Sequence, residues 1–364
     1  MGISNNGTNE LIVGKYHPAV DGNVLSMTQH VGLVAGCTGI AGRAILETLN
    51  VSEQWHAMGL ARRPDPSAGG KLVSVDLTDP VSLRNVLEDL ETVTHLFYAA
   101  YQVGNTRDDE VAPNLAMLTN LVEAVESVAG GLQRILLMQG SKWYGSHLGP
   151  YQTPAREDDP RHPSALFYYD QQDWIVERQQ GKSWAWVSLR PHGIWGYAIG
   201  SQLNMMNAIA VYATLLKHMG LPLYFPGKSA AYSAIYQMTD AQHLAKASLW
   251  AMTSPDTVNQ SFNITNGDLI RWKYAWPLIA EWFGMEEGSE RPVDLAMFAA
   301  DKDTMWKDIC DIYDLEPFRI HELTTWEAAS SFLFNVDWDQ CSSLTKIQKS
   351  GWNDVVDTYE MIPR

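Results

Sequence analysis

A glycine-rich stretch near the N-terminus constrains the fold of this chain more than any other feature. Residues 30–42 read as an apolar strand, a tight turn and the start of a helix, and glycines recur there at a spacing of three: Gly36, Gly39 and Gly42. Bare glycine backbone lets a diphosphate approach closely, and a helix N-terminus adds free N–H groups and positive partial charge. A tight turn without a ligand is the alternative, but the strand before and the helix after favour a dinucleotide site. We expect its contacts to come from Gly36, Thr38, Gly39 and Ile40.

Apolar, strand-like segments then alternate with helical ones. Helices are expected over about 112–128 and 165–180. Such alternation predicts an α/β fold with a doubly wound parallel sheet of the Rossmann type. The further segments that read as strands are 55–61, 71–77, 94–100, 134–138 and 184–189.

The composition is that of a folded, acidic protein. Hydrophobic residues make up 46% of the chain, charged residues 19%, and the formal net charge is −16. Nucleic acid and an anionic membrane surface would be repelled, so neither is an expected partner. The sparse cysteines form no disulfide framework, and no apolar run is long enough to span a bilayer. Together these features predict a cytoplasmic protein.

The end of the second strand indicates which nicotinamide nucleotide binds. Ala61 is followed by Arg62, Arg63 and Pro64, and the first acidic residue, Asp65, comes only after the proline. A carboxylate at this point binds the ribose 2′-hydroxyl of NAD, whereas arginines suit the 2′-phosphate of NADP. The sequence therefore favours NADPH, with Ala61, Arg62 and Arg63 as contacts; a solvated loop with two surface arginines is the alternative.

Later strand ends supply further candidate contacts. Asp76, with Leu77 against the ring, is placed to bind the adenine amine, and it is equally suited to cap the helix that begins near Asp79. The carboxyl ends of the fourth and fifth strands should face the cofactor, because ligands bind at this edge of an open sheet. These ends and the loop after the sixth strand add Ala99, Gln139 and Ile194.

A lysine and a pair of tyrosines carry the candidate chemistry. Lys142 follows the fifth strand, and Tyr168 and Tyr169 open the next helix. A tyrosine can donate a hydrogen bond to a substrate carbonyl, and a nearby lysine can lower the pKa of that phenol and hold a ribose hydroxyl. Most short-chain dehydrogenases place the lysine four residues after the tyrosine, but Gln172 and Asp173 stand at those positions here. Lys142 can replace it from the preceding loop.

Several motifs together resemble one family. They are 36–42, 61–64, 94–98, Lys142 before 144–145, 167–170, 190–191, 205–207, 262–268 and 272–273. With them the chain, from about residue 30 onward, resembles the progesterone 5β-reductase/iridoid synthase-like group of atypical short-chain dehydrogenases/reductases. The resemblance implies a fold of the extended type, NADPH as cofactor, and reduction of the C=C bond of enones such as steroids and acyclic terpenoid dialdehydes. It also implies that Lys142 and Tyr168 are the catalytic pair.

Alternatives stay open at this point. Tyr169 could be the reacting phenol, since a helix turns adjacent side chains about 100° apart and only one can face the nicotinamide. The chain could instead reduce a ketone or aldehyde, or be a non-redox protein, either a cyclase or isomerase or an NADPH sensor. His192 could add proton chemistry, although a loop-capping role is favoured. The expected substrate is a small apolar enone or ketone, and a homodimer is left open.

The length of 364 residues suggests two lobes. We expect a loose leader over 1–28, an NADP-binding domain over 29–200, and a smaller, mainly helical substrate-binding lobe over 201–364. Within the last, 230–270 should partly return to the sheet, with Asp240 capping a helix. A helix over 201–218 carries methionines that suit a pocket floor, and the tryptophan-rich final third should form a helical cap over the pocket mouth.

Overall fold

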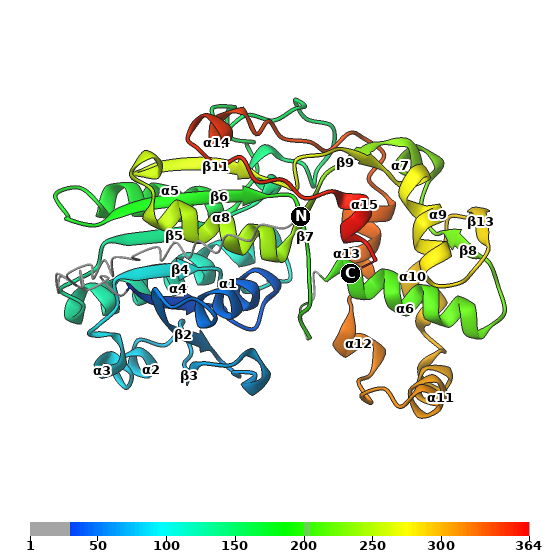
Figure 1. Cartoon of the computed structure of the whole chain (residues 1–364), viewed down its shortest axis with the longest axis horizontal. Helices are drawn as coiled ribbons and strands as arrows, with labels where there is room; N and C mark the ends of the chain where they lie inside the picture. The colour runs from blue at the N-terminus through cyan, green and yellow to red at the C-terminus, as the bar shows by residue number, and fades with distance from the viewer. Residues whose placement is uncertain (1–29, 200, 202–203, 364) are drawn as a thin grey trace, which may run out of the picture.

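A sheet of seven parallel strands organises the structure. The computed structural model describes residues 30–199, 201 and 204–363, so the expected leader lies outside the described residues. The strands lie side by side in the order β11-β6-β5-β4-β1-β2-β3 (Figure 1). Every neighbouring pair is parallel, as predicted. The strands are β1 (His30–Ala35), β2 (Trp55–Ala61), β3 (Lys71–Ser74), β4 (His95–Tyr98), β5 (Arg134–Met138), β6 (Ala185–Pro191) and β11 (Gln260–Ile264).

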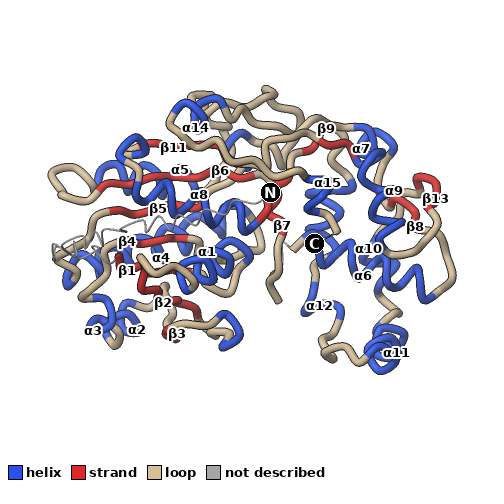
Figure 2. Tube along the Cα trace, in the orientation of Figure 1, coloured by secondary structure: helices blue, strands red, loops and turns tan. Residues whose placement is uncertain are grey.

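Helices cover both faces of this sheet, which explains why its central strands are largely apolar (Figure 2). Leu33 and Val34 are adjacent and fully buried, but they belong to different cores. Val34 packs in the core of α1 and α8, and Leu33 in the core of α4 and α5. Successive side chains of a strand point to opposite faces, so both must be apolar here. These helices are α1 (Ile40–Asn50), α4 (Arg107–Val128), α5 (Phe167–Arg178) and α8 (Ala241–Thr253).

The strand order reverses at β1. From there β2 and β3 extend the sheet to one side, and β4, β5, β6 and β11 extend it to the other. At such a switch point a crevice opens outside the carboxyl ends of the strands, which is where open α/β sheets bind ligands. The turn after β1 and the loop after β4 meet at this crevice.

A second core forms a lobe beside the sheet, at the right of Figure 1. Interlocked aromatic rings fill it, with Phe225 meeting Trp276 edge to face at 5.2 Å and Trp272 fully buried beside them. Burial of such large rings is the main stabilisation available to a mainly helical unit. Its elements are β7 (Gly193–Trp195), α6 (Met205–His218), β8 (Leu223–Phe225), α7 (Ser229–Ser233), β9 (Ile235–Tyr236), β10 (Met238–Asp240), β12 (Ile270–Arg271), α9 (Trp272–Trp282), β13 (Glu287–Glu290), α10 (Leu295–Ala299), α11 (Asp303–Tyr313), α12 (Ile320–Leu323), α13 (Trp326–Ala329) and α15 (Thr358–Met361).

The C-terminal residues do not all join that lobe. Ile347 of α14 (Thr345–Lys349) and Trp352 are buried in the core of α1 and α8. The Trp352 ring lies 5.6 Å from that of Trp250 on α8. The expectation that the whole tryptophan-rich third caps the pocket is therefore wrong at this end, because α8 offers an apolar face that Trp352 covers.

Some element ends differ from their predicted bounds. The helix expected from about residue 112 begins at Arg107, where Thr106 and Asp109 form a reciprocal capping box, and it continues through Pro113. The third strand ends at Ser74 rather than near Asp76. The short helices α2 (Pro80–Arg84) and α3 (Leu87–Leu90) follow it.

In the second half of the chain, N-cap residues determine where two helices begin. The helix expected from Ser201 begins at Met205, capped by Asn204. Asp240 caps α8 as predicted, accepting a hydrogen bond from His243 N at 2.7 Å. Across the described part of the chain, no helix combines the length and the apolar character that a membrane crossing requires.

Candidate active site

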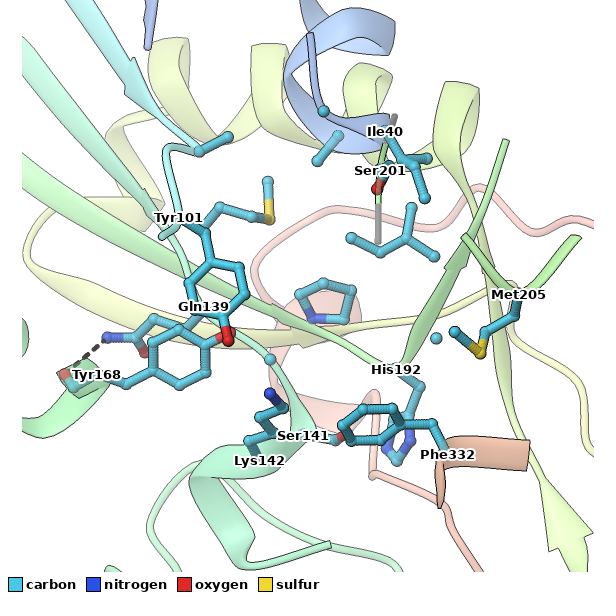
Figure 3. Close-up of a pocket in the computed structure, with 18 of the residues that line it drawn as sticks. Ile40, Tyr101, Gln139, Ser141, Lys142, Tyr168, His192, Ser201, Met205 and Phe332 are labelled. Atoms are coloured by element: carbon cyan, nitrogen blue, oxygen red, sulfur yellow. Dashed lines mark hydrogen bonds between the residues drawn. The ribbon is translucent and has the colours of Figure 1, made fainter. Parts of the chain in front are cut away.

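One cavity at the carboxyl ends of the strands brings together half of the candidate residues, including both proposed catalytic residues (Figure 3). The glycine turn, the loops after β4, β5 and β6, and the start of α5 form its walls, and the second lobe closes it with Met205 and Phe332. Lys142 and Tyr168 both line it. The expected apolar character is present, since most of the lining side chains are aliphatic or aromatic.

The glycine turn has the close packing that its spacing predicted. A β-carbon on Gly36, whose φ is +80°, would lie 2.7 Å from the Ala99 carbonyl oxygen, and one on Gly42 would lie 2.2 Å from the Gly36 oxygen. Gly39 is the N-cap of α1 and supplies no side-chain cap, so the first N–H groups of the helix have no partner of that kind. Because Gly39 also lines the cavity, the turn has the bare backbone and helix N-terminus that a diphosphate requires.

Lys142 lies in a single helical turn, Ser141–Tyr144, that follows β5. Its ammonium group is 5.6 Å from the centre of the Tyr101 ring and 5.0 Å from that of Phe332. Burial lowers the pKa of Lys142, the Glu110 carboxylate opposes this, and Arg107 adds to it. A half-buried cation among aromatic rings is poised to interact with a polar group entering the cavity.

Buried hydrogen bonds hold this turn in place. Tyr144 donates to Asn263 Oδ1 at 2.6 Å and accepts from Arg190 at 3.2 Å. The Arg190 guanidinium also lies 3.6 Å from the centre of the Trp143 ring and donates to Gln139 at 3.1 Å. Residues from β6 and β11 therefore fix the backbone on both sides of Lys142, which is a role for the 190–191 motif that its sequence alone did not reveal.

The structure separates the two adjacent tyrosines. Tyr169 donates to the Trp143 carbonyl oxygen at 2.6 Å and accepts from His162 N at 3.0 Å. Tyr168 lines the cavity instead, with its hydroxyl 3.5 Å from where a β-carbon on Gly140 would stand. Burial raises the pKa of Tyr168, and Glu110 adds to the effect. The Tyr168 phenol therefore stays protonated, as a hydrogen-bond donor must.

The other predicted cofactor contacts fall into two groups. Gly39, Ile40, Ala99, Gln139 and Ile194 line the cavity together with Lys142 and Tyr168. The rest do not line it: Gly36, Thr38, Ala61, Arg62, Arg63, Asp76 and Leu77. This second group lies in the turn after β1 and at the ends of β2 and β3, on the side of the switch point where the adenosine half of a dinucleotide would extend.

Asp76 does not cap the helix that follows it. Its carboxylate accepts hydrogen bonds from the backbone and hydroxyl of Thr78, at 2.9 and 2.7 Å. The cap of α2 is Asp79, which accepts from Val81 N at 2.8 Å. The capping alternative for Asp76 is wrong, because β3 ends at Ser74 and the Asp76 side chain closes the turn between the strand and α2. A contact between Asp76 and adenine stays a prediction.

The arginine pair after β2 stands on an anchored loop. Asp65, the acidic residue that follows Pro64, forms an ion pair with Arg43 at 2.6 Å and accepts a hydrogen bond from Ser67 N at 2.9 Å. These partners lower the pKa of the Asp65 carboxyl, the Ser67 hydrogen bonds most strongly. Arg62 and Arg63 are exposed beside it. The carboxylate is thus occupied, while the two cations face solvent.

His192 is buried against the cavity. Its Nε2 is 2.8 Å from the Ser342 hydroxyl, and burial lowers its pKa to about 4. A neutral imidazole that ties the loop after β6 to the C-terminal segment fits the favoured loop-capping role.

Within the described residues, no group of three or more histidine, cysteine, aspartate or glutamate side chains is arranged to hold a metal ion.

Three aromatic residues of the cavity were not identified from the sequence: Tyr101, Tyr236 and Phe332. Tyr101 directly follows the predicted end of the fourth strand, so the rule that ligands bind at strand ends would have found it. Phe332 lies in a π-helical segment, Ser330–Phe334, far along the chain. No local signal marks it, because only the packing of the second lobe brings it to Lys142.

Comparison with known proteins supports the fold described above. By overall fold the chain is similar to the UDP-glucose 4-epimerase of Thermus thermophilus, whose crystal structure is a complex with NAD, with a TM-score of 0.63, 17% identity, and coverage of 92% of this chain and 96% of that one. The fold is therefore the Rossmann fold of the short-chain dehydrogenase/reductase type.

A family model and curated relatives are more specific. The model described as a PRISE-like Rossmann-fold domain matches residues 76–361. The chain is 32% identical to the (S)-8-oxocitronellyl enol synthase CYC2 of Camptotheca acuminata, covering 84% of this chain and 83% of that one. It is 31% identical to the 3-oxo-Delta(4,5)-steroid 5-beta-reductase of Arabidopsis thaliana, with the same coverage. It is 29% identical to the short chain dehydrogenase gsfE of Penicillium aethiopicum, over 90% of this chain and 94% of that one. The chain belongs to the PRISE-like Rossmann-fold family, and the resemblance read from its motifs is confirmed.

Proposed function

We propose that this protein is an NADPH-dependent reductase that adds hydride to the C=C bond of a small, apolar α,β-unsaturated carbonyl compound. The observation that carries the proposal is the position of Lys142 and Tyr168, which line one cavity beside the glycine turn. The relatives support the class of reaction, because one of them is named as a steroid 5-beta-reductase and others as enol synthases.

Tyr168 is the group that would hold the substrate. Addition of hydride to the β-carbon moves negative charge onto the carbonyl oxygen, and a phenol aimed at that oxygen stabilises the charge as it forms. The Tyr168 hydroxyl is suited to this role because burial keeps it protonated. The enolate then needs one proton at its α-carbon, which solvent supplies.

Lys142 would act through its charge. An ammonium group in a cavity of low polarity stabilises a developing enolate more than it would in water, since few water dipoles screen it. Its half-buried position between Tyr101 and Phe332 provides such surroundings. Lys142 would also hold a ribose hydroxyl of the cofactor, because it follows a strand end that faces the cofactor.

The residues present fit an NADP nucleotide. The bare backbone at Gly39 and the uncapped start of α1 suit the diphosphate. Arg62 and Arg63 suit the 2′-phosphate, because Asp65, which would otherwise compete for a ribose hydroxyl, is paired with Arg43. When bound, the reduced nicotinamide supplies the hydride. A cytoplasmic location and a homodimer stay predictions.

The decisive experiment is a screen of NADPH oxidation over cyclic and acyclic enones beside plain ketones, with product analysis after labelling the transferred hydride with deuterium. Deuterium on the β-carbon of a saturated product supports the proposal. Deuterium on a carbinol carbon identifies a carbonyl reductase and contradicts it. Conversion of substrate without consumption of NADPH contradicts it as well, and points to a non-redox protein.

A further inference from the structure

The cavity contains a second tyrosine, and that tyrosine has a partner of its own. The Tyr101 hydroxyl donates to Glu110 Oε1 at 2.6 Å. Glu110 lies in the first turn of α4 and also accepts from Gly104 N at 3.4 Å. A phenol bonded to a carboxylate at this distance has committed its only proton. Tyr101 therefore presents to the cavity its ring and an oxygen that can only accept.

The Tyr101 ring lies next to Lys142 and is linked to Tyr168 through the ring of Phe167. It stacks on Phe167 with the ring centres 5.3 Å apart and an interplanar angle of 18°. Phe167 in turn meets the Tyr168 ring edge to face at 4.5 Å. Lys142 Nζ lies 5.6 Å from the centre of the Tyr101 ring. Figure 3 shows Tyr101, Tyr168 and Lys142 grouped on one side of the cavity.

Glu110 also brings a negative charge to this group. It raises the pKa of Lys142 against the effect of burial, and it adds to the effect of burial in raising the pKa of Tyr168. Both effects keep a proton where the proposed reaction needs one. The other titratable or charged groups that face Lys142 are Arg107 on α4, Tyr101 after β4, Tyr168 on α5 and His147 in the loop after its own turn.

We infer that Glu110 is a positioning residue: its hydrogen bond fixes the Tyr101 ring against Phe167 and Lys142, its charge balances the Lys142 ammonium, and Tyr168 is left as the phenol that donates to the substrate. This inference rests on the proposed function for its consequence in catalysis. It makes Tyr101 a wall of the substrate cavity rather than a second proton donor.

Substitutions at Glu110 separate its geometry from its charge. In Glu110→Gln the amide oxygen can still accept from Tyr101, so the hydrogen bond is kept and the charge is lost. In Glu110→Ala both are lost. Tyr101→Phe removes the donor and keeps the carboxylate. Asp108→Asn is the matched control, because Asp108 is an exposed carboxylate in the same helical turn.

The first readout is the titration of Lys142 itself, followed by NMR after reductive ¹³C-methylation of the lysines, with the Lys142 signal assigned from Lys142→Arg. We expect the titration midpoint to fall in Glu110→Gln and Glu110→Ala, and to stay at the wild-type value in Asp108→Asn. An unchanged midpoint in Glu110→Gln, or an equal shift in Asp108→Asn, overturns the inference. This readout needs no turnover. A protein that shows the expected midpoints but reduces no enone would therefore contradict the proposed function and leave the inference about Glu110 standing.

The second readout divides binding from turnover. Glu110→Ala and Tyr101→Phe should raise KM for the enone about tenfold, the equivalent of one ordinary hydrogen bond, because the cavity wall is no longer fixed. Glu110→Gln should leave KM within about twofold of wild type, because Tyr101 keeps an acceptor. If Tyr101→Phe abolishes turnover as completely as Tyr168→Phe, Tyr101 is itself the donor and the inference is wrong.

Discussion

The hydroxyl of Tyr169 donates to the carbonyl oxygen of Trp143 at 2.6 Å. This bond ties the first turn of α5 to the short helical turn that carries Lys142. Adjacent side chains on a helix point about 100° apart, so fixing Tyr169 on Trp143 turns Tyr168 toward the cavity. The position of the proposed donor is therefore set by a residue that does not itself line the site.

The two tyrosines should respond differently to the loss of their hydroxyl groups. Tyr168→Phe should lower kcat for enone reduction by about two to three orders of magnitude, because one oxyanion donor is worth about 3 kcal/mol in the barrier. Tyr169→Phe should keep most of the turnover and lose about 1 kcal/mol of stability, because it removes a hydrogen bond to a backbone oxygen. Steady-state kinetics and urea unfolding measure the two effects. Near-full activity in Tyr168→Phe would show that the roles are misassigned.

The choice between NADPH and NADH should depend on the arginine pair. Replacing Arg62 and Arg63 together by alanine should reduce the preference for NADPH by about ten- to a hundredfold, because hydrogen bonds to a charged phosphate are worth about 1.5–3 kcal/mol. The loss should appear in KM for NADPH, with KM for NADH little changed. Arg84→Ala is the control, since Arg84 is exposed on α2 and is not one of the predicted cofactor contacts. An unchanged preference in the double variant would assign the arginines to a solvated loop.

Gly42 should tolerate no side chain. A β-carbon there would lie 2.2 Å from the Gly36 carbonyl oxygen, which is backbone and cannot move aside as a flexible side chain would. We expect Gly42→Ala to lose about 1–3 kcal/mol of stability, as overpacked cores do, with weaker NADPH binding because the turn and helix separate. Gly130→Ala is the matched control, because a β-carbon at Gly130 meets nothing within 4 Å. Equal urea midpoints for the two variants would contradict this account of the third glycine.

The anchor of the arginine loop should be sensitive to acid. The pKa of the Asp65 carboxyl is lowered in the folded protein by Ser67 and then by Arg43. Its contribution to stability is therefore fully present above its unfolded pKa of about 4, and is lost as the pH falls through the lower folded value. The difference in unfolding free energy between wild type and Asp65→Asn should be largest above about pH 5 and should shrink below about pH 4.

A second variant tests the stated cause of that dependence. Ser67→Ala removes the hydroxyl that donates to Asp65 at 2.7 Å but leaves the backbone N–H and Arg43. The unfolding free energy of Ser67→Ala should depend on pH less than that of wild type, yet more than that of Asp65→Asn. Unfolding free energies measured by urea titration across the acid range decide this. If the difference in unfolding free energy between wild type and Asp65→Asn were constant with pH, the lowered pKa of Asp65 would not be the source of the pH dependence.

Much of the first half of the fold follows from local pattern. Apolar runs of strand length alternate with helices, and the glycine spacing fixes the turn after β1 because only glycine fits where Gly36 and Gly42 approach other backbone. Helix ends were less predictable. The first turn of α4 is polar and precedes Pro113, so its start depends on the capping box of Thr106 and Asp109 rather than on hydrophobic periodicity.

What the sequence determined by itself is the family, the parallel sheet and the residue types at the strand ends, because these depend on short-range spacing. Tertiary structure decided which tyrosine enters the cavity, that Arg190 supports the Lys142 turn, and that Phe332 and Glu110 face the same lysine. These relationships join segments distant in the chain, and no local period encodes them. They follow from the way the second lobe and the helices pack against the sheet, where burial of large apolar surfaces brings the polar groups together.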